Sequence, residues 1–197
     1  MMQIDYYFST ISPFTYLSGT RPAQVAAKHG ASLNYKPLDI MGLFGRTGGT
    51  PPKDRHENRK AYRLTEMRRA AAKLEMPINL QPAHWPTNAA PSSYAIIAAV
   101  RDGSGDVADL VAGLTRACWA EEKDIAQDEV IGDCLVAAGF DRTLVDHDMM
   151  QGAETYARNL EDAVKAGAFG APFFIVGEEP FWGQDRIDDL DAYLAAV

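Results

Sequence analysis

The feature of this sequence that most limits its fold is the placement of its strand patterns, which lie only near the two ends of the chain. Residues 3–8 (Gln-Ile-Asp-Tyr-Tyr-Phe) are mostly β-branched and aromatic, as strand residues are. A second strand is expected over 33–38. A helix over about 13–29, interrupted at Pro22 and ended by Gly30, separates the two. A β-α-β unit of this kind places its two strands parallel in one sheet.

The C-terminal end contains the other strand patterns. Residues 172–176 (Pro-Phe-Phe-Ile-Val) form an apolar run, and a Gly-Glu turn region separates them from residues 180–182 (Pro-Phe-Trp). Two short runs joined by a tight turn predict a β-hairpin. Helices are expected on either side of this hairpin, over about 153–167 and about 184–196.

The middle of the chain carries only helical patterns, separated by two irregular stretches. The stretch 42–53 is rich in Gly, Thr and Pro, and the stretch 77–91 carries four prolines. Helices are predicted over about 55–74, 92–102, 106–121, 127–138 and 141–149. This order of elements predicts an α/β thioredoxin-like fold with an all-helical insertion. Residues 1–41 and 153–197 would form the thioredoxin-like domain, and residues 42–152 the helical insertion domain.

Composition narrows the classes of function. The formal net charge is −8, which argues against nucleic-acid binding, although residues 53–73 alone hold eight Lys/Arg against three Asp/Glu. That basic helix could face a small anionic ligand or could simply be a solvated surface. The four histidines show no metal-ligand spacing, so no metal site is expected.

The N-terminus and the cysteines indicate the compartment. Residues 1–7 have neither the basic nor the apolar region of a signal peptide, and no apolar run is long enough to span a membrane. The two cysteines, Cys118 and Cys134, form no C-x-x-C pair and are expected to be buried. We therefore expect a cytoplasmic protein whose thiols stay reduced.

The first candidate for chemistry is the junction between the first strand and the first helix. Ser12-Pro13-Phe14-Thr15 stands where a thioredoxin fold would carry C-x-x-C. A helix N-terminus favours a thiolate there, but a serine cannot form a disulfide. Ser12 could donate a hydrogen bond to a sulfur supplied by a ligand, or it could only cap the helix.

The second candidate is the entry to the third strand, Gly170-Ala171-Pro172. A proline at the start of a strand after Gly-Ala predicts a cis Ala171–Pro172 bond. The Ala171 backbone could then pair with an extended peptide such as glutathione, in the manner of strand addition. The alternative is a trans proline that opens an edge strand.

These segments resemble one known family. The N-terminal Tyr-Phe-Ser-Thr-Ile-Ser-Pro-Phe-Thr-Tyr is similar to the signature of 2-hydroxychromene-2-carboxylate isomerases and kappa-class glutathione transferases, which are relatives of the disulfide oxidoreductase DsbA. So are Phe169-Gly-Ala-Pro-Phe-Phe-Ile-Val-Gly and Phe181-Trp-Gly-Gln-Asp-Arg. The resemblance covers nearly the whole chain, with its motifs in the same order.

The resemblance implies a cofactor and its contacts. Glutathione would place its sulfur at Ser12 and pair its backbone with Ala171 beside Pro172. Asp185 would receive the γ-glutamyl ammonium, with Gln184 adding a polar contact; without the resemblance, Asp185 could equally be a favourable helix N-terminal charge. A basic residue of the long helix would contact an anion. The family usually has lysine there, whereas this chain offers Arg59 or Lys60.

The resemblance also implies an activity. It indicates a glutathione-dependent cis-trans isomerase of an aromatic conjugated carboxylate and allows a homodimer. Two alternatives stay open at this point: a kappa-like glutathione transferase that keeps the thioether as product, or a thioredoxin-fold binding protein without catalysis.

Overall fold

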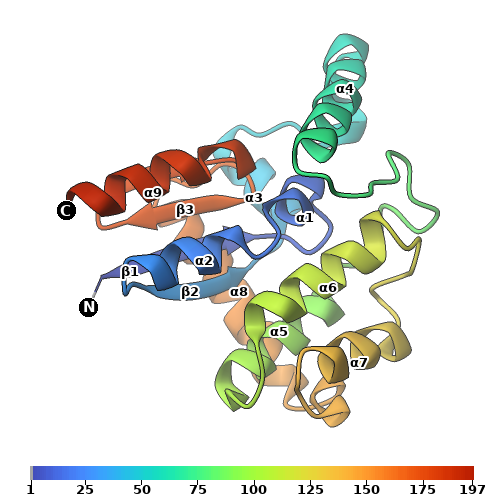
Figure 1. The fold of residues 1–197 in the computed structure, drawn as a ribbon. Coiled ribbons are helices and arrows are strands. Elements are labelled where there is room, and N and C mark those ends of the chain that lie inside the picture. Colours follow the sequence, from blue (N-terminus) through green and yellow to red (C-terminus); the bar gives the residue numbers. More distant parts are fainter. Residues whose placement is uncertain (1) are drawn as a thin grey trace.

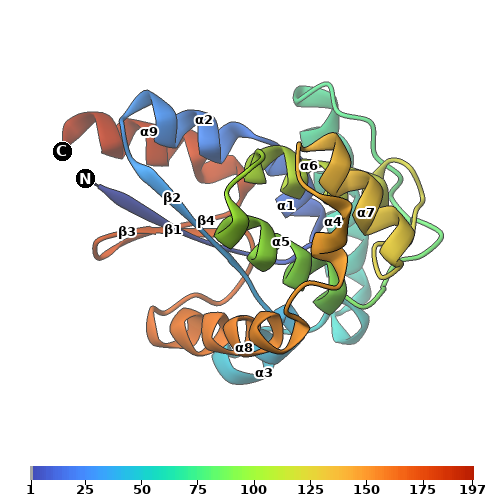
Figure 2. The same ribbon diagram turned by 90° about the horizontal axis from the view of Figure 1, so that it is seen from below.

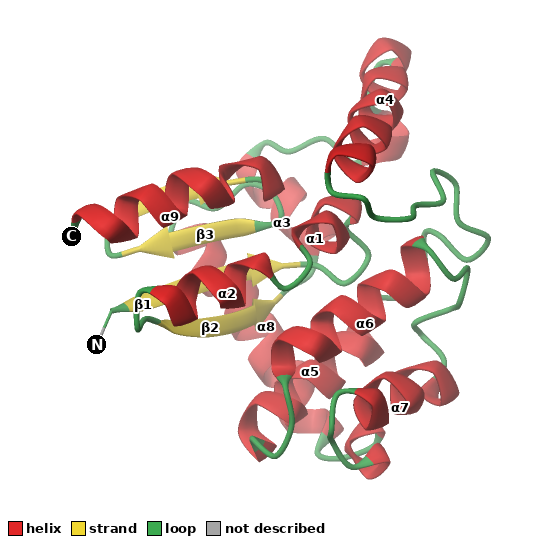
Figure 3. Ribbon diagram, in the orientation of Figure 1, coloured by secondary structure: helices red, strands yellow, loops and turns green. Residues whose placement is uncertain are grey.

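The computed structural model describes residues 2–197, and its strands all belong to one sheet (Figure 3). The strands are β1 (Gln3–Phe8), β2 (Ser32–Pro37), β3 (Phe173–Val176) and β4 (Glu179–Trp182). The α-helices are α1 (Pro13–Ser18), α2 (Arg21–Lys28), α3 (Ile40–Thr47), α4 (Glu57–Lys73), α5 (Ala90–Asp102), α6 (Val107–Trp119), α7 (Asp128–Ala137), α8 (Met149–Lys165) and α9 (Ile187–Ala196). Short 3-10 turns occupy η1 (Pro52–Asp54), η2 (Arg142–Val145) and η3 (Gln184–Arg186).

The sheet has the strand order β2-β1-β3-β4. Strand β1 pairs parallel with β2, and β3 pairs antiparallel with both β1 and β4. The predicted parallel pair at the N-terminal end and the predicted hairpin at the C-terminal end are therefore both confirmed. The α/β thioredoxin-like fold with helices inserted between its two halves is confirmed with them.

Alternation along β1 divides the apolar core between the two faces of the sheet, because successive side chains of a strand point to opposite sides. Tyr6 and Phe8 pack with Phe174 in the larger cluster, which also takes residues of α5, α6 and α9. Tyr7 packs on the opposite side with Phe173 and with residues of α3 and α8. Figure 2 shows α2 and α9 along one face of the sheet and α3 and α8 along the other.

Helix α4 lies apart from both faces. Figure 1 shows it beyond α1, away from the sheet. Met67 and Ala71 of α4 are buried in a third cluster with Tyr16 of α1 and Trp119 of α6. This cluster ties α4 to the end of the sheet at which β1 runs into α1.

The prediction of an irregular stretch over 42–53 is wrong for its first half, because α3 occupies Ile40–Thr47. Asp39 caps this helix by accepting a hydrogen bond from the Met41 N–H at 3.0 Å. Gly42 lets it approach α8, since a Cβ there would come within 3.0 Å of the Leu160 side chain. The glycine that suggested a loop therefore serves close helix packing.

Two other helix predictions need correction. The single helix over 13–29 is two helices, α1 and α2, separated at Gly19 and Thr20, with Pro22 in the first turn of the second. The helix over 141–149 is only the short turn η2, and α8 begins at Met149 after Asp148 adopts a left-handed backbone conformation (φ 58°).

The proposed division at 41/42 and 152/153 remains a prediction; α3 and α8 run across these two points. In the described part of the chain, no helix combines the length and apolarity that crossing a membrane requires. Residues 2–197 also contain no cluster of three or more His, Cys, Asp or Glu side chains suited to a metal ion.

Candidate functional site

Two segments that lie far apart in the sequence meet at the start of α1. The Ser12 hydroxyl donates a hydrogen bond to the Ala171 carbonyl oxygen at 3.2 Å. The Ser12 oxygen also accepts the Thr15 N–H at 3.3 Å, which makes Ser12 the N-cap of α1. Ser12 is 9% exposed, so its hydroxyl lies just below the surface. The structure therefore supports the capping role of Ser12 and also places it beside the Ala171 backbone.

The Ala171–Pro172 peptide bond is cis, as the sequence predicts. The Pro172 carbonyl accepts the Gly183 N–H at 3.0 Å, which holds the entry of β3 against the end of β4. Among residues 2–197, the Ala171 N–H has no hydrogen-bond acceptor. One backbone donor at this site is therefore free to pair with a ligand.

Gln184 and Asp185 belong to η3, which packs against α1. Arg21 holds this turn in place: its guanidinium donates to the Gln184 carbonyl at 3.1 Å and to the Gln184 side-chain oxygen at 2.9 Å. The same nitrogen donates to the Leu17 carbonyl of α1 at 2.9 Å. Burial lowers the pKa of Arg21, with Asp188 acting in the opposite direction. Sequence reasoning missed Arg21, because no pattern links it to a turn 163 residues later.

The Asp185 carboxylate is more than half exposed and lies 3.4 Å from the Arg186 guanidinium. It folds back over Gly183, whose φ of 114° and missing side chain leave room for it, because a Cβ there would lie 2.5 Å from the Asp185 oxygen. Burial, and then the neighbouring Asp185, raise the pKa of Glu66 in α4. The Asp185 carboxylate is therefore near enough to Glu66 to act on it electrostatically.

Arg59 and Lys60 lie near the start of α4. Lys60 pairs with Glu57 of the same helix at 2.9 Å, and Arg59 is exposed. Within the described residues, no hydrogen bond or ion pair joins either side chain to Ser12, Ala171 or Asp185. Their role toward an anion stays a prediction.

Arg63, one helical turn after Arg59, is the basic residue of α4 that turns inward. Its guanidinium carbon lies 5.2 Å from the ring centroid of Trp85 and 6.0 Å from that of Trp119. The Trp85 indole in turn donates to the carbonyl of Ile11, the residue before Ser12, at 2.9 Å. Sequence reasoning missed this arrangement, because Trp85 lies in a loop without a periodic pattern.

A cavity of about 270 Å³ opens on another side of Ile11. Its polar lining comes from Asp39, Asn88 and Tyr156, together with Thr87. Burial raises the pKa of Tyr156, and the nearby Asp39 acts in the same direction. The cavity therefore carries acidic and neutral groups and no basic side chain.

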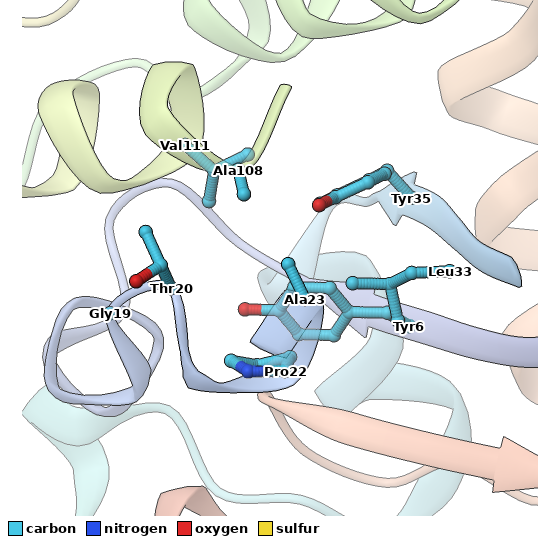
Figure 4. Close-up of a pocket in the computed structure, with 9 residues that line it drawn as sticks. All are labelled: Tyr6, Gly19, Thr20, Pro22, Ala23, Leu33, Tyr35, Ala108 and Val111. Atoms are coloured by element: carbon cyan, nitrogen blue, oxygen red, sulfur yellow. The ribbon is translucent and has the colours of Figure 1, made fainter. Parts of the chain in front are cut away.

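A second hollow lies between α2, α6 and the sheet, around Tyr6, Thr20 and Tyr35 (Figure 4). It has no room for a water molecule, and the buried Tyr6 hydroxyl there has no hydrogen-bond partner among residues 2–197. This hollow is therefore too small to hold a ligand.

The two thiols lie away from this junction, on α6 and α7, and both are free. Burial raises the pKa of Cys118 to about 12 and that of Cys134 to about 11. Both thiols therefore stay protonated at neutral pH, and neither is suited to thiol–disulfide exchange.

Comparisons with known proteins agree with this fold. The family model described as DSBA-like thioredoxin domain matches residues 3–195. The 2-hydroxychromene-2-carboxylate isomerase of Sphingobium xenophagum is 28% identical over 194 residues, which cover 97% of each chain. A solved structure of a 2-hydroxychromene-2-carboxylate isomerase superposes with a TM-score of 0.79 at 24% identity, covering 99% of this chain and 95% of that one. The cytosolic disulfide reductase DsbM of Pseudomonas aeruginosa, solved with GSH, superposes with a TM-score of 0.71 at 18% identity over 98% of both chains.

Proposed function

The chain belongs to the family of DSBA-like thioredoxin domains, and on this basis we propose that it is a glutathione-dependent isomerase of an aromatic conjugated carboxylate. The observation that carries the proposal is the contact between Ser12 and Ala171 at a junction that has no cysteine. A family member without a thiol of its own at this position needs a sulfur from elsewhere. The similarity to 2-hydroxychromene-2-carboxylate isomerases over almost the full length indicates which reaction that sulfur serves.

The residues present fit glutathione. The free Ala171 N–H and the Ala171 carbonyl together offer one donor and one acceptor, as an extended peptide backbone requires. The exposed Asp185 carboxylate is suited to the γ-glutamyl ammonium, and the Gln184 amide nitrogen remains available, since Arg21 engages only the oxygen. Bound at Ser12 and Ala171, glutathione would supply a thiolate as the nucleophile for reversible addition to the conjugated substrate.

Ser12 has a defined task in this proposal. The Ser12 hydroxyl has a single proton, and in this structure that proton points to the Ala171 carbonyl oxygen in a hydrogen bond. Rotation of that proton toward a sulfur would stabilise the thiolate and release the Ala171 carbonyl to accept an N–H of the ligand. The Thr15 N–H would continue to donate to the Ser12 oxygen and so keep the hydroxyl in place.

The basic segment 53–73 is expected to hold the substrate carboxylate, and the aromatic side chains near Ile11 to line the substrate side. A cytoplasmic location and a homodimer remain part of this proposal.

The decisive experiment combines titration calorimetry with reduced glutathione and turnover of 2-hydroxychromene-2-carboxylate followed by absorbance. We expect glutathione to bind, turnover to require it, and mass spectrometry to recover it unchanged at the end. Consumption of glutathione into a stable thioether would indicate a transferase. No binding at all would indicate a thioredoxin-fold binding protein.

A further inference from the structure

The strongest feature outside the Ser12–Ala171 contact is the guanidinium of Arg63 above two tryptophan rings. The rings of Trp85 and Trp119 lie 5.5 Å apart between centroids and are tilted by 50°. Trp119 is fully buried, and Trp85 and Arg63 are partly buried. We call Arg63, Trp85 and Trp119 the cationic shelf.

The cationic shelf lacks acceptors for its donors. A guanidinium carries five N–H donors, yet Arg63 makes no hydrogen bond or ion pair within residues 2–197. The buried Trp119 indole N–H has no acceptor in the same range of residues. The Trp119 N–H is closed off from solvent, whereas the partly buried Arg63 guanidinium can be reached, so Arg63 is the donor that an acceptor from outside the chain could pair with.

The electrostatic environment favours an anion as that acceptor. Burial, together with the neighbouring Arg55 guanidinium, lowers the pKa of Arg63 to about 10, and Glu66 offsets this only in part. Burial and the Arg59 guanidinium likewise lower the pKa of Arg55. A carboxylate placed at Arg63 would relieve this repulsion, and a planar guanidinium binds a carboxylate through two parallel hydrogen bonds.

The position of the cationic shelf connects it to the proposed reaction. The Trp85 indole binds the Ile11 carbonyl, so the shelf is one residue away from Ser12. The neighbouring cavity is lined by Asp39 and has no basic residue, so it would repel an anion. The shelf therefore combines a cation with aromatic surface directly beside the junction.

We propose that Arg63 binds the carboxylate of the aromatic substrate and that Trp85 contacts its ring, which rests on the proposed isomerase function. In this arrangement Arg63 takes the place that the sequence suggested for Arg59 or Lys60. It acts as a substrate-binding residue that determines specificity for acids.

The test is the binding of trans-2-hydroxycinnamate and of its uncharged amide, measured by calorimetry with and without saturating reduced glutathione. We expect Arg63→Gln to raise the Kd of the acid at least about tenfold, because a bidentate charged contact is lost. Arg63→Lys should recover part of the loss. Arg158→Gln, an exposed change on α8 outside the basic segment, should leave the Kd unchanged. The amide should bind to the parent and to Arg63→Gln equally.

Two further readouts separate this inference from the proposed function. Thermal unfolding checks that Arg63→Gln is folded, and its Kd for reduced glutathione should equal that of the parent. Equal binding of the acid by parent and variant, no binding by the parent, or a loss confined to glutathione would each overturn the inference. Failure of the proposed function would instead show as absent glutathione-dependent turnover in the parent, whatever the acid does.

Discussion

The Ser12 hydroxyl donates to the Ala171 carbonyl oxygen across a sequence separation of 159 residues. The same hydroxyl accepts the Thr15 N–H, so Ser12 combines a structural and a proposed chemical role in one side chain. A variant at position 12 is informative only if it distinguishes the helix-capping role from the proposed contact with sulfur.

We expect Ser12→Ala to weaken both roles. Loss of the cap should lower the free energy of unfolding by roughly 0.5–2 kcal/mol. Loss of the hydroxyl should cost the bound thiolate roughly 1.5–3 kcal/mol, seen as a raised pKa of bound glutathione in its thiolate absorbance. Ser12→Gly is the matched control, since glycine at an N-cap costs only a few tenths of a kcal/mol. If Ser12→Gly leaves the thiol pKa unchanged, Ser12 is only a helix cap.

Arg21 should affect glutathione binding without touching it. The Arg21→Lys ammonium is one bond short of the guanidinium nitrogen that donates to Leu17 and to both Gln184 oxygens, so η3 should loosen and the free energy of unfolding should fall by about 1–3 kcal/mol. The Kd for glutathione should rise, while the absorbance pKa of the bound thiol should not change. Lys28→Met is the control, because it removes only an exposed ion pair with Asp191, far from η3 in the sequence and screened by solvent. A normal Kd in Arg21→Lys would contradict the positioning role.

Patterns within single segments allowed the sheet and the cis Ala171–Pro172 bond to be predicted. The β-branched and aromatic residues of 3–8 and the apolar run after Pro172 indicate strands whatever surrounds them. The same approach failed at α3, because Gly42 serves contact with Leu160, which only the folded chain brings near. The cationic shelf was missed for a similar reason. Its members come from α4, a loop and α6, and a loop contact such as that of Trp85 with Ile11 leaves no periodic signal.

Acid should weaken the ion pairs that join α2 to α9. The Lys28 ammonium and the His29 ring hold the pKa of Asp191 below its ordinary value. A carboxyl with a lowered pKa contributes stability above its unfolded pKa of about 4, and loses it as the pH falls through the lower folded value. Asp191→Asn should therefore be less stable than the parent in urea at pH 7, and the difference should shrink below about pH 4. Glu154→Gln, an exposed change on α8, should show no such dependence; a gap that stays constant down to pH 3 would argue against this ion pair.

Asp185 offers the sharpest test of the glutathione pose. Asp185→Asn keeps the shape of the side chain over Gly183 and removes only its charge, so the free energy of unfolding should change by about 1 kcal/mol or less. The Kd for glutathione should rise about tenfold or more, because a charge-assisted hydrogen bond to the γ-glutamyl ammonium is lost. An analogue without the γ-glutamyl amine should bind parent and variant equally.

Two control measurements show whether weaker glutathione binding by Asp185→Asn comes from the lost charge at this position. Asp189→Asn removes another exposed carboxylate that pairs with the same Arg186, at 3.2 Å, and should leave glutathione binding unchanged. In Asp185→Asn the pKa of Glu66 should move down toward its ordinary value in an NMR titration, since Asp185 is one of the groups that raise it. That shift would show that the variant is folded and that residue 185 still lies near enough to act on Glu66. If glutathione then binds as tightly as in the parent, Asp185 does not receive the ammonium, and the proposed pose is wrong.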